Sequence, residues 1–151
     1  MSWTSMTQTQ RNQALVNYGL PLIGSWGGQC KEFVRTVVKG ASAAAGGPQR
    51  DIPPNQPPPN DYMWVNDPVN YPYVIGLSAP IQNVSIGWIL QLRMFSGIPH
   101  TFIVSGKDAA GVWMLDSNWS PAPGDEIVRN HYKTFTDFVA TFQSWSCYYI
   151  Q

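Results

Sequence analysis

Charge is scarce in this sequence, and the little there is cancels. Nine lysine and arginine residues balance nine aspartate and glutamate residues, and charged residues make up only 12% of the 151 residues. A nucleic-acid-binding domain normally carries a basic stripe, and an anionic membrane or wall polymer attracts clustered basic residues. The composition therefore argues against a nucleic-acid partner and against electrostatic capture by an anionic surface.

Long hydrophobic runs and a secretion signal are also missing. The apolar stretches fall far short of the ~18 residues that a membrane-spanning helix needs. The sequence starts Met-Ser-Trp-Thr-Ser-Met-Thr-Gln-Thr-Gln-Arg, without the basic segment and following apolar segment of a signal peptide. We therefore expect no membrane span and no signal peptide, so that action outside the cell depends on another release or delivery route.

Cysteine is rare as well, because only Cys30 and Cys147 are present. Two cysteines are too few for a disulfide scaffold, and their spacing fits no metal site. One disulfide between them is the alternative to two free thiols. The segment Trp145-Ser-Cys-Tyr-Tyr predicts a core strand, so we expect Cys147 to be a buried free thiol.

What the chain does have is enough apolar sequence for one domain. At 151 residues and 44% hydrophobic composition it can bury a core, and residues 1–151 are predicted to form a single domain. Thirteen prolines and thirteen glycines predict many turns. Prolines concentrate in a predicted loop over residues 46–60, and residues 62–80 are expected to be irregular.

The first part of the chain has helical periodicity. A helix is predicted over residues 5–18, with Gly19 suited to the position after its end. A second, amphipathic helix is predicted over residues 29–39, with Gly40 after it. The apolar face of this second helix consists of Cys30, Phe33, Val34, Val37 and Val38.

The rest of the chain has the residue pattern of β-strands. Strands are predicted at 88–94, 100–105, 112–116, 126–132 and 146–150, with a turn at 106–111. Thr134 or Thr136 is expected to cap a short helix that reaches about residue 143. Helices followed by antiparallel strands predict an α+β fold, with the N-terminal helices packed on an antiparallel β-sheet.

Cys30 and His100 are the candidate reacting pair. Cys30 begins a helix behind Gly27-Gly28-Gln29, where unpaired amide groups and the helix dipole favour a thiolate. A thiolate needs an imidazole to accept and return its proton. His100 opens a predicted strand, whereas His131 is interpreted as structural or exposed. The alternative for Cys30 is an ordinary buried cysteine of an apolar helix face.

The predicted hairpin brings a third group to His100. If the turn at 106–111 is tight, His100 lies opposite Asp116 or Ser117, within one residue. Asp116 and Asn118 share a strand face, and opposed side chains have Cβ atoms ~5 Å apart. An acidic or amide oxygen can then fix the imidazole tautomer. The alternative is a polar strand end that leads into a turn.

Four segments together resemble the CHAP family of cysteine, histidine-dependent amidohydrolases and peptidases. They are Trp26-Gly-Gly-Gln-Cys-Lys-Glu-Phe-Val34, Val84-Ser-Ile-Gly-Trp-Ile-Leu-Gln-Leu, Pro99-His-Thr-Phe-Ile-Val104 and Leu115-Asp-Ser-Asn-Trp119. They occur in the family's order. Two departures are Trp88 in place of a usual aspartate and Asp116 in place of a glutamate.

The resemblance implies a papain-like fold and roles for several residues. Cys30 would be the nucleophile, His100 the base, Asp116 the group that orients His100, and Asn118 a second polar partner. Gln29, with the Cys30 amide, is a candidate for the oxyanion hole. Trp26 and Trp119 flank this site as candidate substrate-binding residues, or as core and rim residues. Some family members bind calcium ahead of the cysteine, but no aspartate precedes Asp51, so neither metal nor cofactor is expected.

The implied substrate is bacterial peptidoglycan, which the protein would cleave as an amidase or as an endopeptidase. The predicted place of action is the cell wall, reached with a phage-tail or secretion-system carrier. One alternative is an effector that hydrolyses or deamidates a protein or small amide. Another is a structural phage-tail module of the same fold.

Overall fold

A computed structural model describes residues 1–55, 67–119 and 125–151. The predicted proline-rich loop 46–60 lies partly outside these ranges, as does the beginning of the region 62–80. Within them the chain forms three α-helices, α1 (Gln8–Gly19), α2 (Cys30–Ala44) and α3 (Phe135–Thr141). Short 3-10 helices cover Trp3–Ser5, Leu20–Leu22 and Ile81–Asn83. None of the described helices is long and apolar enough to cross a membrane.

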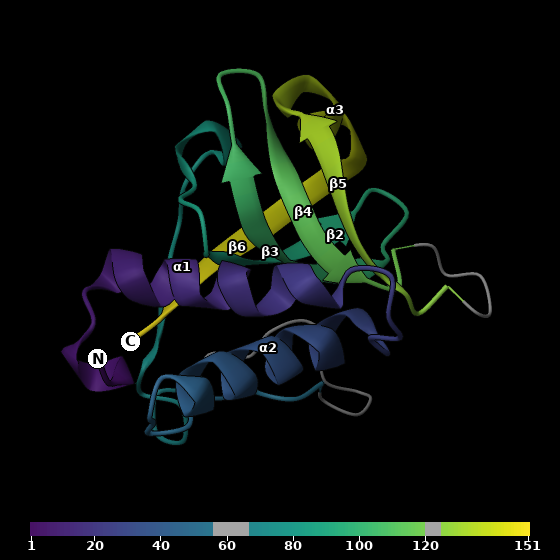
Figure 1. Cartoon of the computed structure of the whole chain (residues 1–151). Coiled ribbons are helices and arrows are strands. Elements are labelled where there is room, and N and C mark those ends of the chain that lie inside the picture. Colours follow the sequence, from purple (N-terminus) through teal and green to yellow (C-terminus); the bar gives the residue numbers. More distant parts are fainter. Residues whose placement is uncertain (56–66, 120–124) are drawn as a thin grey trace.

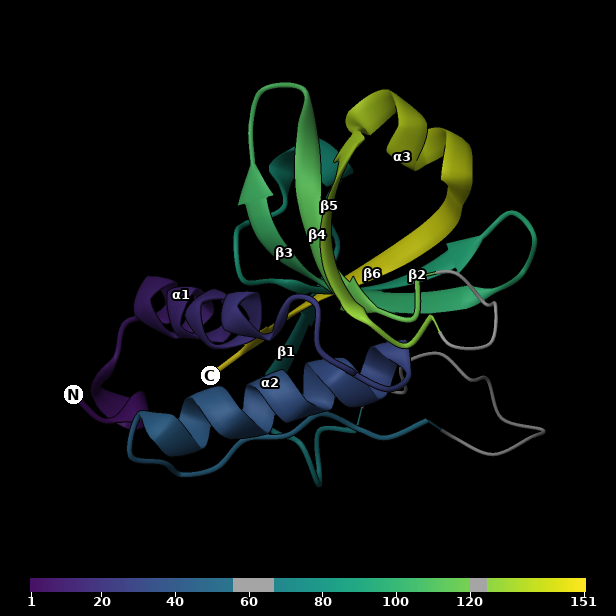
Figure 2. The same cartoon turned by 45° about the vertical axis from the view of Figure 1, so that its right-hand side comes forward.

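The strands of the described residues form one sheet in which every neighbouring pair is antiparallel. They are β1 (Val74–Leu77), β2 (Ile89–Met94), β3 (Pro99–Lys107), β4 (Gly111–Ser117), β5 (Val128–Thr134) and β6 (Phe142–Ile150). Their order in the sheet is β1-β6-β2-β3-β4-β5. Figures 1 and 2 show α1 and α2 together on one side of this sheet and α3 at its far end. The predicted α+β fold, with N-terminal helices on an antiparallel sheet, is confirmed.

Alternating side chains of the strands supply two apolar cores. Ile89, Ile103 and Leu115 face α1 and α2, whose Val34 and Val37 are fully buried against them. The neighbouring residues Leu90, Phe102 and Met114 face the other way and pack with Phe138 of α3. Period-two alternation thus places the strands β2, β3 and β4 between two apolar layers, and His100 shares the face of Phe102.

Local sequence explains where the helices begin. Thr7 caps α1 in a capping box, because its hydroxyl accepts from the Gln10 amide and its own amide donates to the Gln10 side chain. Thr134 caps α3 by accepting from the Asp137 amide at 3.1 Å, which confirms the first of the two predicted caps.

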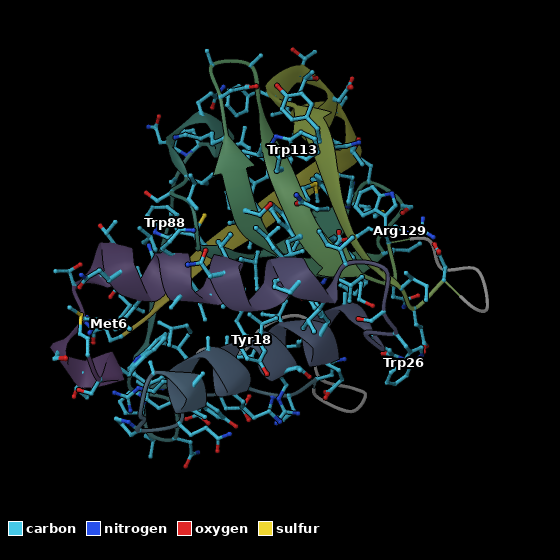
Figure 3. All side chains as sticks on the ribbon, viewed as in Figure 1. Met6, Tyr18, Trp26, Trp88, Trp113 and Arg129 are labelled. Carbon is cyan, nitrogen blue, oxygen red and sulfur yellow. The ribbon has the colours of Figure 1, made fainter. Side chains whose placement is uncertain are left out.

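Gly40 does not end the second helix, contrary to the prediction of a helix over 29–39. The helix α2 continues through the alanine-rich turn to Ala44, because alanine has the highest helix propensity. A Cβ at Gly40 would lie 2.1 Å from the Tyr18 ring. Figure 3 shows Tyr18 in the space between α1 and α2. This glycine therefore permits close helix packing instead of a helix stop.

Two further elements differ from the sequence prediction. The strand β1 (Val74–Leu77) lies within the region expected to be irregular and pairs with the end of β6. The strand β6 begins at Phe142, directly after α3, and is four residues longer at its start than predicted. Part of the predicted proline-rich loop is packed, since Ile52 is fully buried and Asp51 pairs with Arg35.

The two ends of the described chain meet on the same side of the fold. The Trp3 indole N–H donates to the carbonyl oxygen of Gln151 at 2.9 Å. The Gln8 side chain donates to the Ile150 carbonyl at 2.8 Å. Figure 1 shows both ends beside α1, away from the first turn of α2. The first helix is thereby fastened to the last strand.

Candidate active site

Cys30 occupies the first turn of α2, as predicted. Gln29 is the N-cap residue in extended conformation, and Gly28 before it has a φ of +71°, in the left-handed region that favours glycine. The sharp turn presents the sulfur at the end of a helix whose first amide groups have no partner within the helix. The Cys30 side chain is buried but lines a cavity.

The segment before Cys30 is fastened to strands β4 and β5. The Gly27 amide donates to the Glu126 carbonyl at 2.8 Å, and the buried Ser117 hydroxyl donates to the Gly28 carbonyl at 2.6 Å. A Cβ at Gly27 would lie 2.6 Å from Val128 and 2.7 Å from the Ser117 hydroxyl. The glycine thus allows the close approach that sets the position of the cysteine relative to the sheet.

Strands β3 and β4 bring an imidazole and a carboxylate together. Ile103 pairs with Leu115, and this antiparallel register places His100 and Asp116 diagonally on one face. The Nε2 atom of His100 lies 2.7 Å from Oδ2 of Asp116, which is fully buried. The sequence expectation that these two residues face each other agrees with this arrangement.

Asn118 lies beyond the end of β4 and adopts a φ of +59°. It lines the same cavity as Cys30 and His100. Among the described residues its amide makes no hydrogen bond to the imidazole. The group that orients His100 in this structure is therefore Asp116.

The surroundings of Cys30 favour its thiolate. Burial alone would raise the pKa of the thiol, but it is outweighed by the hydrogen bond to His100 and the charge of that imidazole. Backbone hydrogen bonds from Thr101 and Lys31 add to them, and together these interactions lower the pKa of Cys30 below its ordinary value.

His100 is shifted in the complementary direction. Burial lowers its pKa, but the hydrogen bonds to Asp116 and to Cys30, with their charges, raise the pKa of His100 to about 9. Because Nε2 faces Asp116, Nδ1 is the ring nitrogen left for the sulfur. A lowered thiol pKa beside a raised imidazole pKa favours a thiolate–imidazolium pair over the neutral pair.

The cavity above this pair has a volume of about 200 Å³. The described residues that line it are Gln29, Cys30, Met94, Ile98, Pro99, His100, Asn118 and Trp119. Apart from the reacting pair, these lining side chains carry no formal charge. The opening thus suits a small, uncharged group next to the sulfur.

The two candidate tryptophans have different positions. Trp119 lines the cavity, and its ring packs edge-on against His100 with centroids 5.2 Å apart. Trp26 is 73% exposed, its indole donates to Glu126, and it is not among the residues that line the cavity. Figure 3 shows Trp26 at the outer edge of the molecule. Trp26 therefore belongs to the rim and Trp119 to the wall.

His131 also reaches this site, although the sequence interpretation left it outside as structural or exposed. Its Nε2 lies 2.9 Å from Oδ2 of Asp116. Met114 pairs with His131 across β4 and β5, so His131 is a diagonal neighbour of Asp116 on one face. The register of β4 against β5 is the signal that would have placed His131 in the site. Sequence periodicity does not give this register, because it cannot align two strands across the residues that connect them.

Other titratable groups do not form a metal site among the described residues, where no group of three or more histidine, cysteine or acidic side chains is arranged to hold an ion.

Cys30 and Cys147 are both free, so the alternative of a disulfide between them is wrong. Cys147 is fully buried in β6, and burial raises its pKa. The prediction of a buried free thiol there is confirmed.

No family model and no curated protein matches this sequence. Its fold resembles that of solved structures, among them two of Ly7917. The crystal structure of Ly7917 is 16% identical with a TM-score of 0.53, and the match covers 94% of this chain and 62% of that chain. The crystal structure of Ly7917 with the hydrolyzing product of MDP is 15% identical with a TM-score of 0.51, covering 96% and 63%. This chain therefore spans less than two thirds of the length of either match.

Proposed function

We propose that this protein is a cysteine hydrolase of the CHAP type that cleaves amide bonds in bacterial peptidoglycan. The observation that carries the proposal is the Cys30–His100–Asp116 arrangement, in which a helix-end sulfur, an imidazole and a buried carboxylate follow one another in hydrogen-bond contact. This order of nucleophile, base and orienting acid is the one that nucleophilic amide hydrolysis requires.

The proposed reaction begins with the thiolate of Cys30 attacking the amide carbonyl carbon. The negative charge that develops on the carbonyl oxygen is stabilised by the Cys30 backbone N–H and by the side chain of Gln29, which lines the cavity. The Nδ1 proton of the His100 imidazolium goes to the departing nitrogen, which leaves as an amine. The acyl group stays on the sulfur as a thioester.

Water then completes the cycle. Neutral His100 takes a proton from a water molecule, and the resulting hydroxide attacks the thioester carbonyl. The carbon–sulfur bond breaks, the acid product leaves, and Cys30 and His100 return to the thiolate–imidazolium pair. Asp116 accepts a hydrogen bond from Nε2 and holds the ring so that Nδ1 faces the sulfur.

Two observations support peptidoglycan as the substrate. The uncharged cavity lining suits a bond flanked by small neutral groups, such as the linkage between the lactyl group of muramic acid and L-alanine, or an alanyl peptide bond. The Ly7917 structure holds a hydrolysis product of MDP, a peptidoglycan fragment, on a similar fold. The proposed substrate puts the place of action at the bacterial cell wall.

The test is digestion of purified peptidoglycan by the protein and by its Cys30→Ala variant. We expect the unmodified protein to release soluble fragments with new free amino groups, detected by mass spectrometry, and Cys30→Ala to release none. Cys147→Ser is the matched control, because it removes the other thiol, which does not line the cavity.

Equal release by the protein and its Cys30→Ala variant would contradict the mechanism. If Cys30 reacts as an activated thiol but no peptidoglycan fragments appear, the substrate is another amide, as in the effector hypothesis. A Cys30 that reacts like an ordinary thiol would favour the structural-module hypothesis.

A further inference from the structure

His131 contacts the site through the carboxylate that orients His100. It lies on β5, and its side chain is 27% exposed, whereas Asp116 is fully buried. Its Nε2 is 2.9 Å from Asp116 Oδ2, the same oxygen that lies 2.7 Å from Nε2 of His100. Two imidazoles thus converge on one carboxylate oxygen.

The chemistry of these contacts fixes the protons. An ionised carboxylate only accepts hydrogen bonds, so both Nε2 atoms must carry hydrogen for both contacts to be favourable. For His100 this leaves Nδ1 for the sulfur of Cys30. For His131 it leaves Nδ1 without a partner among the described residues. His131 is therefore a donor to Asp116 and makes no direct contact with the reacting atoms.

The surroundings of Asp116 give it no other ionic partner within the described ranges. Arg129 lies directly opposite Asp116 in the β4–β5 register, but its guanidinium pairs with Asp125. The ammonium group of Lys133 lies over the Trp119 ring, 5.6 Å from its centroid. On α3, which packs on the same strands, Asp137 is exposed. The second hydrogen bond to the buried carboxylate therefore depends on His131.

Trp119 holds the two imidazoles in place. Its ring centroid is 5.2 Å from that of His100 and 4.5 Å from that of His131. Phe142 of the second apolar core supports the tryptophan from 6.0 Å. The ring thus packs against both donors, which restricts the positions that each imidazole can take.

We infer that His131 is a positioning residue for the Cys30–His100 pair, an inference that rests on the proposed function. Its N–H donor offsets part of the charge of the buried Asp116 carboxylate and fixes that carboxylate toward His100. Without this donor the carboxylate is held less firmly, so that the imidazolium that it orients stabilises the Cys30 thiolate less well. As the pH is lowered, a variant without His131 would therefore lose the thiolate–imidazolium pair at a higher pH than the unmodified protein does.

The test follows the pH dependence of alkylation of Cys30 by iodoacetamide, with the modified peptide identified by mass spectrometry. We expect His131→Leu to move the acidic limb of this profile upward by about one pH unit, from the loss of one hydrogen bond to a charged group. His131→Gln, whose amide can donate in place of the imidazole, should retain most of the original profile. Tyr132→Phe is the control, because Tyr132 lies on the other face of β5 and bonds to Asp108.

A merely structural role for His131 would leave the acidic limb where it is in both variants, and that outcome would overturn the inference while leaving the proposed function intact. An unactivated Cys30 in the unmodified protein would instead overturn the proposed function. Should His131→Leu fail to fold, ring-nitrogen chemical shifts in the unmodified protein decide. We expect protonated Nε2 on His131 at neutral pH, and an Nδ1–H tautomer would refute the inference.

Discussion

The charge of Asp116 can be removed with little change in shape by Asp116→Asn. Burial lowers the pKa of His100, and the hydrogen bond to Asp116 is the strongest of the interactions that raise it to about 9. A hydrogen bond to a charged group contributes ~1.5–3 kcal/mol and one between neutral groups ~0.5–1.5 kcal/mol. The difference is ~1–1.5 kcal/mol, which corresponds to about one pKa unit.

We therefore expect Asp116→Asn to lower the pKa of His100 by about one unit and to reduce the ratio of the thiolate–imidazolium pair to the neutral pair about tenfold. Alkylation of Cys30 by iodoacetamide across pH 5–10 measures both effects. The alkaline limb, where His100 loses its proton, should move to lower pH. Asp137→Asn is the matched control, because it makes the same change on the exposed face of α3.

An unchanged alkaline limb in Asp116→Asn would refute the reasoning, provided that the circular dichroism spectrum is also unchanged. The raised pKa of His100 would then have to originate in its contact with Cys30 alone. A shift of equal size in Asp137→Asn would show that net charge, and not the hydrogen bond to His100, sets the profile.

Two further predictions concern stability. Ser117→Ala removes the buried donor to the Gly28 carbonyl, and we expect the free energy of unfolding in urea to fall by ~1–3 kcal/mol; an unchanged urea midpoint would show that the carbonyl finds another partner. The folded-state pKa of His100 is raised from 6.5 to about 9, so its contribution of ~3 kcal/mol is fully present below pH ~6.5 and is lost as the pH rises through about 9. Urea unfolding at several pH values should show this loss relative to His100→Gln, and parallel curves would contradict the assigned shift.

The sequence predicted the helices and the central strands because their apolar periodicity is strong. The face formed by Phe33, Val34, Val37 and Val38 has helical spacing, and it is buried as that spacing requires. The predicted end of α2 is wrong because Gly40 packs against the Tyr18 ring within the helix and does not end it. Local sequence cannot distinguish a glycine that stops a helix from one that admits a neighbouring ring.

The site shows the same division between local and long-range information. His100 and Asp116 belong to one hairpin, so a short count from the turn at Asp108 came within two residues of their register. His131 was not placed in the site because the β4–β5 connection runs through residues 120–124, and periodicity fixes no register across such a span. The strand β1 was missed for a related reason, because only its pairing with β6 distinguishes it from a loop.

The contact between the Trp3 indole and the Gln151 carbonyl brings residues near the two ends of the described chain close together. A short linker between residues 1 and 151 would close the backbone without crossing the cavity, and new ends could be opened at the exposed Asp108–Ala110 turn. Such a circular permutant would separate His100 and Asp116 by almost the whole chain while leaving them on neighbouring strands. An activated Cys30 in this permutant would show that the geometry of the carboxylate and the imidazole depends on the sheet and not on the hairpin connection.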